Sequence, residues 1–122
     1  MWQIKKSVLI NAMSAAKNYY PDEFMCFLGG DRKTKTINEI VLVPTENTKN
    51  SASINELTIP FDETIVGTLH SHPNENNTPS NADKKFFRKY TLNIILGYPY
   101  DLTNASFYDE NAKIPQVEII ED

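Results

Sequence analysis

The order of apolar and polar residues predicts two helices and several strands. Between residues 6 and 20, apolar residues recur at the spacing of one helix face, and Pro21 marks the end of this helix. The residues expected to face the core from it are Val8, Ala12, Ala15, Ala16 and Tyr19. A second helix is expected at about residues 81–90. Strands or extended segments are expected at residues 2–4, 23–28, 36–43, 57–61, 65–69, 92–97, 105–108 and 114–120.

Three segments indicate their place in the fold. Residues 24–28 are apolar on both sides, which is typical of a central strand covered on both faces. Pro115 places the last strand at or near an edge. The polar stretch 45–53 has no period and is expected to be a loop, either a connection or a lid over a site. The chain is therefore expected to form an α/β (α+β) fold, with a mixed, mostly antiparallel sheet and one helix on each face.

Length and composition indicate one domain that spans residues 1–122, because a chain of this size has room for a single core. The net charge of −4 argues against binding to nucleic acid. The single cysteine excludes an internal disulfide, and no apolar run is long enough for a signal peptide core or a membrane span. The expected location is the cytoplasm, with no membrane partner.

The two histidines of the chain suggest a metal site. His70 and His72 follow an apolar run that is expected to be a buried strand, and residues two apart on a strand share a face. Both imidazoles are therefore expected to point into the same space. A third ligand is available in Asp83, ten residues further on, at the start of the second helix.

Another interpretation of Asp83 is that it only caps this helix. Ser80 and Asp83 have the spacing of a capping box, with Ser80 as N-cap. However, Asp83 shares a helix face with Phe86, Phe87 and Tyr90, so its carboxylate is expected to point toward the core. A buried carboxylate without a partner is costly, and a metal ion would supply the partner.

These residues together resemble the signature of the JAMM (MPN+/Mov34) zinc metalloproteases. The matching residues, in type and in spacing, are His70, Ser71, His72, Pro73, Ser80 and Asp83. The family pattern also has a glutamate at the start of a strand that ends in glycine, and Glu23 fits it. On strand periodicity alone, Glu23 would be an exposed end residue. Cys26 stands where family members often have glycine; it is expected to alter packing and not chemistry.

The resemblance implies a JAMM/MPN core, whose fold resembles that of the cytidine deaminases. Deaminase chemistry itself is excluded because the chain lacks the His-x-Glu and Pro-Cys-x-x-Cys pairs. The expected cofactor is Zn2+, held by His70, His72 and Asp83 with one coordination position open, as in catalytic zinc sites. Glu23 is expected to act as catalytic acid and base and Ser80 as donor to the oxyanion.

The substrate implied by the resemblance is a conjugate of a ubiquitin-like small modifier, cleaved after the modifier's C-terminal glycines. Three alternatives stay open. The first is a peptidase that processes the C-terminus of a sulfur-carrier protein, with identical catalytic residues. The second is a noncatalytic MPN scaffold, which is disfavoured because all metal ligands are present. The third is a RadC-like protein, whose motif has Asn where this chain has Ser71. The short chain is most similar to free-standing archaeal or bacterial members, and its oligomeric state is left open.

Overall fold

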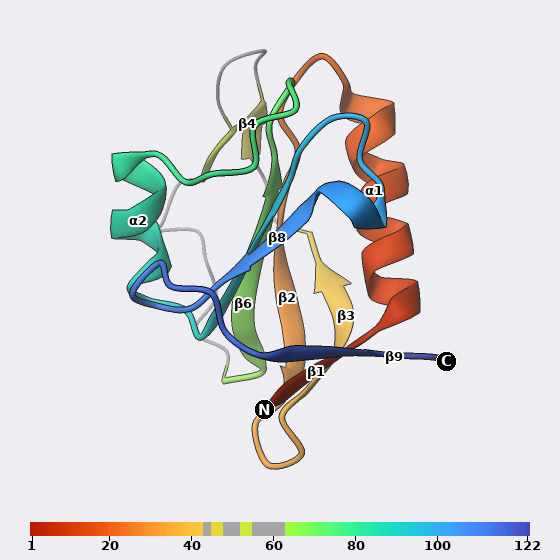
Figure 1. The fold of residues 1–122 in the computed structure, drawn as a ribbon, viewed down its shortest axis with the longest axis vertical. Helices are drawn as coiled ribbons and strands as arrows, with labels where there is room; N and C mark the ends of the chain where they lie inside the picture. The colour runs from red at the N-terminus through yellow and green to blue at the C-terminus, as the bar shows by residue number, and fades with distance from the viewer. Residues whose placement is uncertain (43–44, 48–51, 55–62) are drawn as a thin grey trace.

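A seven-stranded mixed sheet with one helix on either side forms the centre of the fold in the computed structural model (Figure 1). The structure describes residues 1–42, 45–47, 52–54 and 63–122. In chain order the elements are β1 (Trp2–Lys5), α1 (Lys6–Tyr19), β2 (Met25–Asp31), β3 (Thr36–Val41), β4 (Thr45–Asn47), β5 (Ala52–Ile54), β6 (Ile65–Ser71), α2 (Asn81–Phe87), β7 (Leu92–Leu96), a 3-10 helix (Leu102–Asn104), β8 (Ala105–Tyr108) and β9 (Val117–Ile120). This confirms the predicted α+β class.

The strand order β8-β7-β6-β2-β3-β1-β9 places β6 and β2 in the middle of the sheet. β9 is at an edge, as Pro115 predicted. Three neighbouring pairs are antiparallel, namely β7/β8, β2/β6 and β2/β3. Three are parallel, namely β6/β7, β1/β3 and β1/β9. The expectation of a mostly antiparallel sheet is therefore wrong. The chain passes from β6 to β7 through α2, and a helical crossover of this kind joins parallel strands. The expectation failed because apolar periodicity carries no information on strand direction.

The two faces of the sheet are covered by different helices, as Figure 1 shows. The face under α1 is the larger core. Its fully enclosed members include Leu9, Ala12, Ala16, Cys26, Leu28, Leu69, Ile94 and Leu96. On the other face, Phe87 of α2 packs with Ile95 and Tyr108. Cys26 thus lies on the α1 face, away from the second helix, where burial raises the pKa of its thiol to about 12. The cysteine is a packing residue, as expected.

Both predicted helices are present, but the buried residues of α1 and the end of α2 differ from the prediction. α1 has the predicted bounds to within one residue, but Tyr19 is 45% exposed and does not belong to the core. Leu9 and Met13 are buried beside the predicted residues, so the apolar stripe is wider than predicted. α2 ends at Phe87 instead of near Tyr90. After Phe87 the backbone bonds span only three residues, as in Tyr90 N–H to Phe87 O at 3.0 Å, because the turn tightens before β7.

The polar stretch 45–53 is not a plain loop. Residues 45–47 and 52–54 form β4 and β5, which pair antiparallel with Thr45 opposite Ile54. Short polar strands lack the apolar alternation that predicts a strand, so the sequence pattern missed them. The predicted extended segment at residues 57–61 and the end of the strand predicted at 36–43 lie outside the described residues. Among the residues that the structure describes, no helix has the length and apolar character needed to cross a membrane.

β6 and β7 approach so closely that Gly67 cannot carry a side chain. A Cβ atom at this position would lie 2.2 Å from the carbonyl oxygen of Leu92, its partner residue in the parallel pair. We expect Gly67→Ala to lower the free energy of unfolding by about 1–3 kcal/mol, the usual cost of overpacking. Denaturation in urea measures this. The control is Ser14→Ala on the exposed side of α1, expected to change stability by less than about 0.5 kcal/mol. Equal stability of the two variants would contradict the prediction.

Candidate active site

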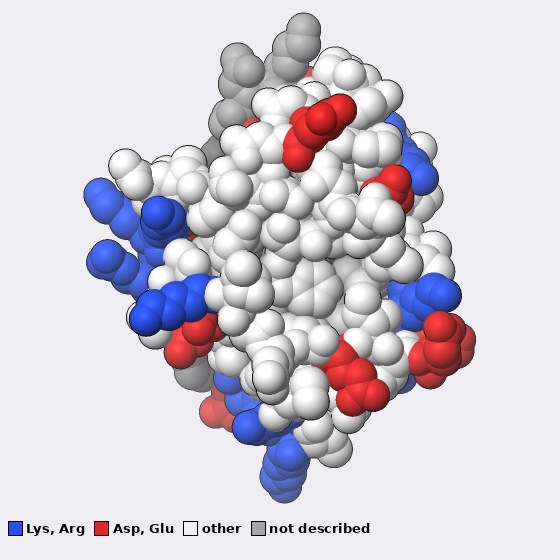
Figure 2. Space-filling model, in the orientation of Figure 1, with Lys and Arg blue, Asp and Glu red and all other residues white. Residues whose placement is uncertain are grey.

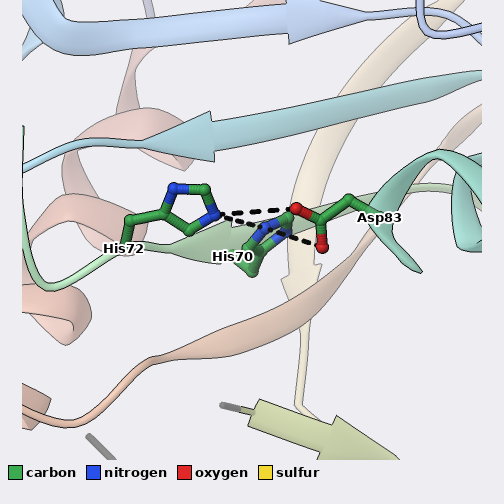
Figure 3. A group of neighbouring side chains, drawn as sticks. All are labelled: His70, His72 and Asp83. Carbon is green, nitrogen blue, oxygen red and sulfur yellow. Dashed lines mark hydrogen bonds and ion pairs between the residues drawn. The ribbon is translucent and has the colours of Figure 1, made fainter. Parts of the chain in front are cut away.

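Strand β6 brings the two histidines together at its C-terminal end. His70 is the second-last residue of the strand, paired with Met25 of β2 and Ile95 of β7. His72 follows the strand, and its N–H donates to the carbonyl of Leu96 at 2.9 Å. The two Nε2 atoms are 3.2 Å apart, as predicted for residues on one face (Figure 3). His70 is buried and its ring contacts that of Phe87, so the pair lies on the face covered by α2.

Asp83 reaches this pair from the first turn of α2 (Figure 3). Its Oδ1 lies 3.5 Å from Nε2 of His70, and its Oδ2 lies 3.7 Å from Nε2 of His72. The capping box is also present: Ser80 Oγ accepts from the Asp83 N–H at 3.1 Å, and Asp83 Oδ2 accepts from the Ser80 N–H at 2.9 Å. Burial alone would raise the pKa of the Asp83 carboxyl, but hydrogen bonds from His70 and His72 outweigh it and hold this pKa well below its usual range.

The chemistry of these atoms fits a bound cation. Nδ1 of His72 lies 2.7 Å from the carbonyl oxygen of Asn76. A carbonyl can only accept, so Nδ1 carries the proton in the neutral ring and Nε2 presents a lone pair. That lone pair faces Nε2 of His70 and a carboxylate oxygen of Asp83, and the ligand atoms of the three residues all lie within 4.8 Å of one another. Acceptor atoms that converge in this way need protons or a metal ion between them.

The electrostatics of His72 agree with this need for positive charge. Burial lowers the pKa of its imidazole, but the hydrogen bond with Asp83, the carbonyl of Asn76 and the charges of Asp83 and Glu23 raise it above its ordinary value. Two imidazoles and one carboxylate are the donor types that zinc binds in hydrolytic sites, where the fourth position stays open. Among the described residues, the group that could hold a metal is the predicted one.

Glu23 lies beside this group and is not an exposed end residue. Its side chain is buried although it precedes β2 by two residues. Burial raises the pKa of its carboxyl; the charges of His70 and His72 act against this rise, and the charge of Asp83 adds to it. These interactions put the carboxyl of Glu23 within the field of all three candidate ligands. The interpretation of an exposed strand end, which periodicity alone favoured, is wrong.

Ser71 ties the segment that carries Glu23 to the histidine pair. The N–H of Phe24 donates to Ser71 Oγ at 2.8 Å, and the N–H of Ser71 donates to the carbonyl of Phe24 at 2.9 Å. Ser71 stands between the two histidines in the sequence and is fully buried. The position of Glu23 is thereby fixed relative to His70 and His72 by two hydrogen bonds, one to the side chain of Ser71 and one between backbone groups.

Sequence reasoning missed Tyr100 as a part of the site. Its phenol donates to the carbonyl of His72 at 2.9 Å, and its side chain is almost fully buried. Tyr100 has a φ of 66°, a conformation that is uncommon outside glycine and worth attention near a functional site. The stretch around Pro99 predicted only a turn, and no local pattern could indicate a hydrogen bond to a residue 28 positions away.

Comparison with known proteins places this geometry in a family. The sequence model of the prokaryotic homologs of the JAB domain matches residues 5–109. The chain belongs to this family. A protein of Haloferax volcanii described as a probable metalloprotease is 28% identical over 119 residues, which cover 90% of this chain and 74% of that protein. The JAMM resemblance indicated by the sequence signature is therefore confirmed.

Solved structures show the same fold over nearly the whole chain. One, reported as a JAMM metalloprotease-like zinc site in the proteasome and signalosome, is 26% identical with a TM-score of 0.79 and coverage of 99% of both chains. A JAB1/MPN domain protein from Archaeoglobus fulgidus is 28% identical, with a TM-score of 0.78 and coverage of 98% of this chain and 99% of that one. A protein from Desulfitobacterium hafniense, 15% identical with a TM-score of 0.63 over 100% and 94% of the chains, shares the fold alone.

The ligand assignment predicts one zinc ion per chain, lost when Asp83 is changed. Asp83→Asn keeps an oxygen that can accept from Ser80, so the helix cap is largely retained while the anionic ligand is removed. Loss of a residue that only hydrogen-bonds to a metal ligand lowers metal affinity roughly 10–100-fold. We expect loss of the ligand Asp83 itself to lower zinc affinity by more than this. Elemental analysis gives the stoichiometry and competition titration the affinity.

The control for this experiment is Glu110→Gln, which removes one negative charge at an exposed position. Its zinc affinity should equal that of the unaltered protein. If Asp83→Asn binds zinc as tightly as this control, Asp83 serves only as a cap and the ligand set is wrong.

Proposed function

We propose that this protein is a zinc-dependent hydrolase that cleaves an amide bond after the C-terminal glycines of a ubiquitin-like small modifier. The observation that carries the proposal is the convergence of His70, His72 and Asp83 with the buried carboxyl of Glu23 beside them. His70, His72 and Asp83 would hold the metal. Zinc bound there supplies Lewis-acid polarisation and a water whose pKa is lowered to about 7.

Glu23 would carry the protons of the reaction. Its raised pKa lies closer to neutral pH than that of an ordinary glutamate, which suits a group that must both accept a proton and give it up. In the proposed sequence the carboxylate of Glu23 accepts a proton from the attacking water and then passes it to the nitrogen of the leaving amine. The two contacts between Phe24 and Ser71 would keep this carboxylate in place during both transfers.

Ser80 would stabilise the negative charge that develops on the carbonyl oxygen of the substrate. Its Oγ accepts from the N–H of Asp83, which leaves its own hydroxyl proton free to donate. The capping role and the proposed catalytic role use different parts of the same group and are compatible. A donor of this kind contributes on the order of 3 kcal/mol in the transition state.

The proposed substrate rests on the family and on the two-stranded sheet β4/β5. The tail of a ubiquitin-like modifier is extended and ends in glycines, so it offers mainly backbone groups, which bind most economically as an added strand. In the described part of the chain, β4 and β5 pair only with each other, which leaves an outer edge on each. One of these edges would receive the tail.

Cleavage assays test the function directly. The protein is incubated with conjugates of candidate modifiers and, separately, with C-terminally extended sulfur-carrier proteins, each with zinc, with a chelator, and with the chelator followed by zinc. Zinc-dependent release of the modifier supports the proposal. Cleavage of the carrier precursors alone would favour the processing peptidase, and no cleavage of any substrate by zinc-loaded protein would favour a noncatalytic scaffold.

Glu23→Gln separates proton transfer from metal binding. We expect the variant to bind zinc as the unaltered protein does and to lose turnover by about 100-fold to 10,000-fold, the usual contribution of general acid-base catalysis. Single-turnover cleavage and zinc titration measure the two effects. A matched control is Glu110→Gln, the same change at an exposed site. Loss of zinc from Glu23→Gln would instead identify Glu23 as a ligand.

Replacing residues 46–52 with a short glycine linker tests the edge that receives the tail. Backbone hydrogen bonds contribute about 1 kcal/mol each, so the loss of two or three should raise KM for the conjugate roughly 30–150-fold. Zinc affinity should stay the same because the segment supplies no ligand. The control places glycines at Thr34 and Lys35, in the turn between β2 and β3 at the far end of the sheet (Figure 1). Unchanged cleavage kinetics would mean that the tail docks elsewhere.

A further inference from the structure

Two side chains from outside hold the loop between His72 and α2. The phenol of Tyr108 donates to the carbonyl oxygen of Asn77 at 2.8 Å, and Asn104 contacts the loop with both ends of its amide. Its Nδ2 donates to the carbonyl oxygens of Glu75 and Tyr98, both at 3.0 Å. Its Oδ1 accepts from Nδ2 of Asn77 at 2.6 Å. Both donors and the acceptor of this amide are thus used, and two of its three partners belong to the loop.

The surroundings fix the amide of Asn104 in place. Asn104 is the last residue of the 3-10 helix Leu102–Asn104, which Asp101 caps by accepting from the N–H of Thr103 at 3.1 Å. The carbonyl of Asn104 accepts from the N–H of Gly97 at 2.9 Å. A Cβ atom on Gly97 would lie 2.4 Å from Nδ2 of Asn104 and 2.8 Å from the carbonyl oxygen of Glu75. Glycine at position 97 is therefore needed for the amide to reach the loop.

The residue between the two clamped positions is the one that orients His72. Asn104 binds Glu75 and Asn77, and the carbonyl of Asn76 lies between them in the chain, 2.7 Å from Nδ1 of His72. If this carbonyl moved away, Nδ1 would lose its acceptor, and the ring could place its proton on Nε2, the nitrogen that faces His70 and Asp83. Hydrogen bonds that set the tautomer of a ligating histidine commonly affect metal affinity.

We propose that Asn104 is a positioning residue of the metal centre: by clamping Glu75 and Asn77 it fixes the carbonyl of Asn76, which keeps the proton of His72 on Nδ1 and its Nε2 free for zinc. The inference rests on the metal site of the proposed function, but not on any cleavage activity. A protein that binds zinc as described and cleaves none of the substrates would still allow this proposal to be tested.

The first measurement uses the unaltered protein without metal. The ¹⁵N spectrum of its histidine rings, recorded at a pH where both are neutral, distinguishes the two tautomers. We expect His72 as the Nδ1–H tautomer. If His72 carries its proton mainly on Nε2, the proposal is overturned, whatever the variants show.

The second measurement uses Asn104→Asp, which keeps the shape of the side chain and replaces the two N–H donors with an oxygen. We expect a mixture of tautomers at His72 and zinc affinity lowered roughly 10–100-fold. The added negative charge by itself would favour a cation, so a loss of affinity cannot come from charge. The control is Asn11→Asp, the same change on the exposed side of α1, which should bind zinc normally.

Asn104→Ala provides a second variant, because it removes the clamp without placing a carboxylate against two carbonyls. The outcome that contradicts the proposal is a folded Asn104 variant of either kind with the Nδ1–H tautomer retained and zinc affinity within twofold of the control. If neither variant folds, the tautomer of the unaltered protein decides, with Gly97→Ala as a further variant that displaces the same amide.

Discussion

Two imidazole nitrogens and a carboxylate occupy one small space in this protein, and that arrangement is stable only when positive charge lies between them. Nε2 of His70 and Nε2 of His72 are closer to each other than either is to Asp83. Without a cation, protons must be shared among the three groups, which explains why the pKa of Asp83 is lowered and that of His72 is raised. Hydrogen bonds with Ser80, Asn76 and Tyr100 hold Asp83 and His72 in this arrangement.

The centre of the sheet supplies the rigidity for this arrangement. β6 and β2 are its middle strands, so the histidines and the segment of Glu23 are attached to the part of the fold with neighbours on both sides. Ser71 joins the two strands at the site through its backbone and its side chain. The parallel neighbour β7 then brings the turn that follows it, with Tyr100, against the carbonyl of His72. The site is therefore located where the tertiary structure is most constrained.

The sequence could predict those parts of the site that depend on local spacing. Strand periodicity predicts that two histidines two residues apart share a face. Helix periodicity predicts that Asp83, at the third position of α2, points toward the core. The spacing of the family motif then groups the three residues into one site. Tyr100 and Asn104 could not be found in this way, because their contacts with the loop after His72 join residues about 30 positions apart. The directions of the strands in the large sheet depend on long-range pairing as well, which the apolar pattern does not contain. β4 and β5 pair locally, and the sequence pattern missed them because short polar strands lack apolar alternation.

Asp83 shows why two interpretations of one motif need not compete. The capping box uses Oδ2, which accepts from the N–H of Ser80. Oδ1 faces His70, and its distance of 3.5 Å from Nε2 of His70 is shorter than the 3.7 Å between Oδ2 and Nε2 of His72. A carboxylate offers about four lone-pair sites, so a cap uses only part of its capacity and at the same time fixes the orientation of the rest. The local signal that predicts the start of α2 thus also orients a candidate metal ligand, and a helix start of this kind is informative when two histidines face it.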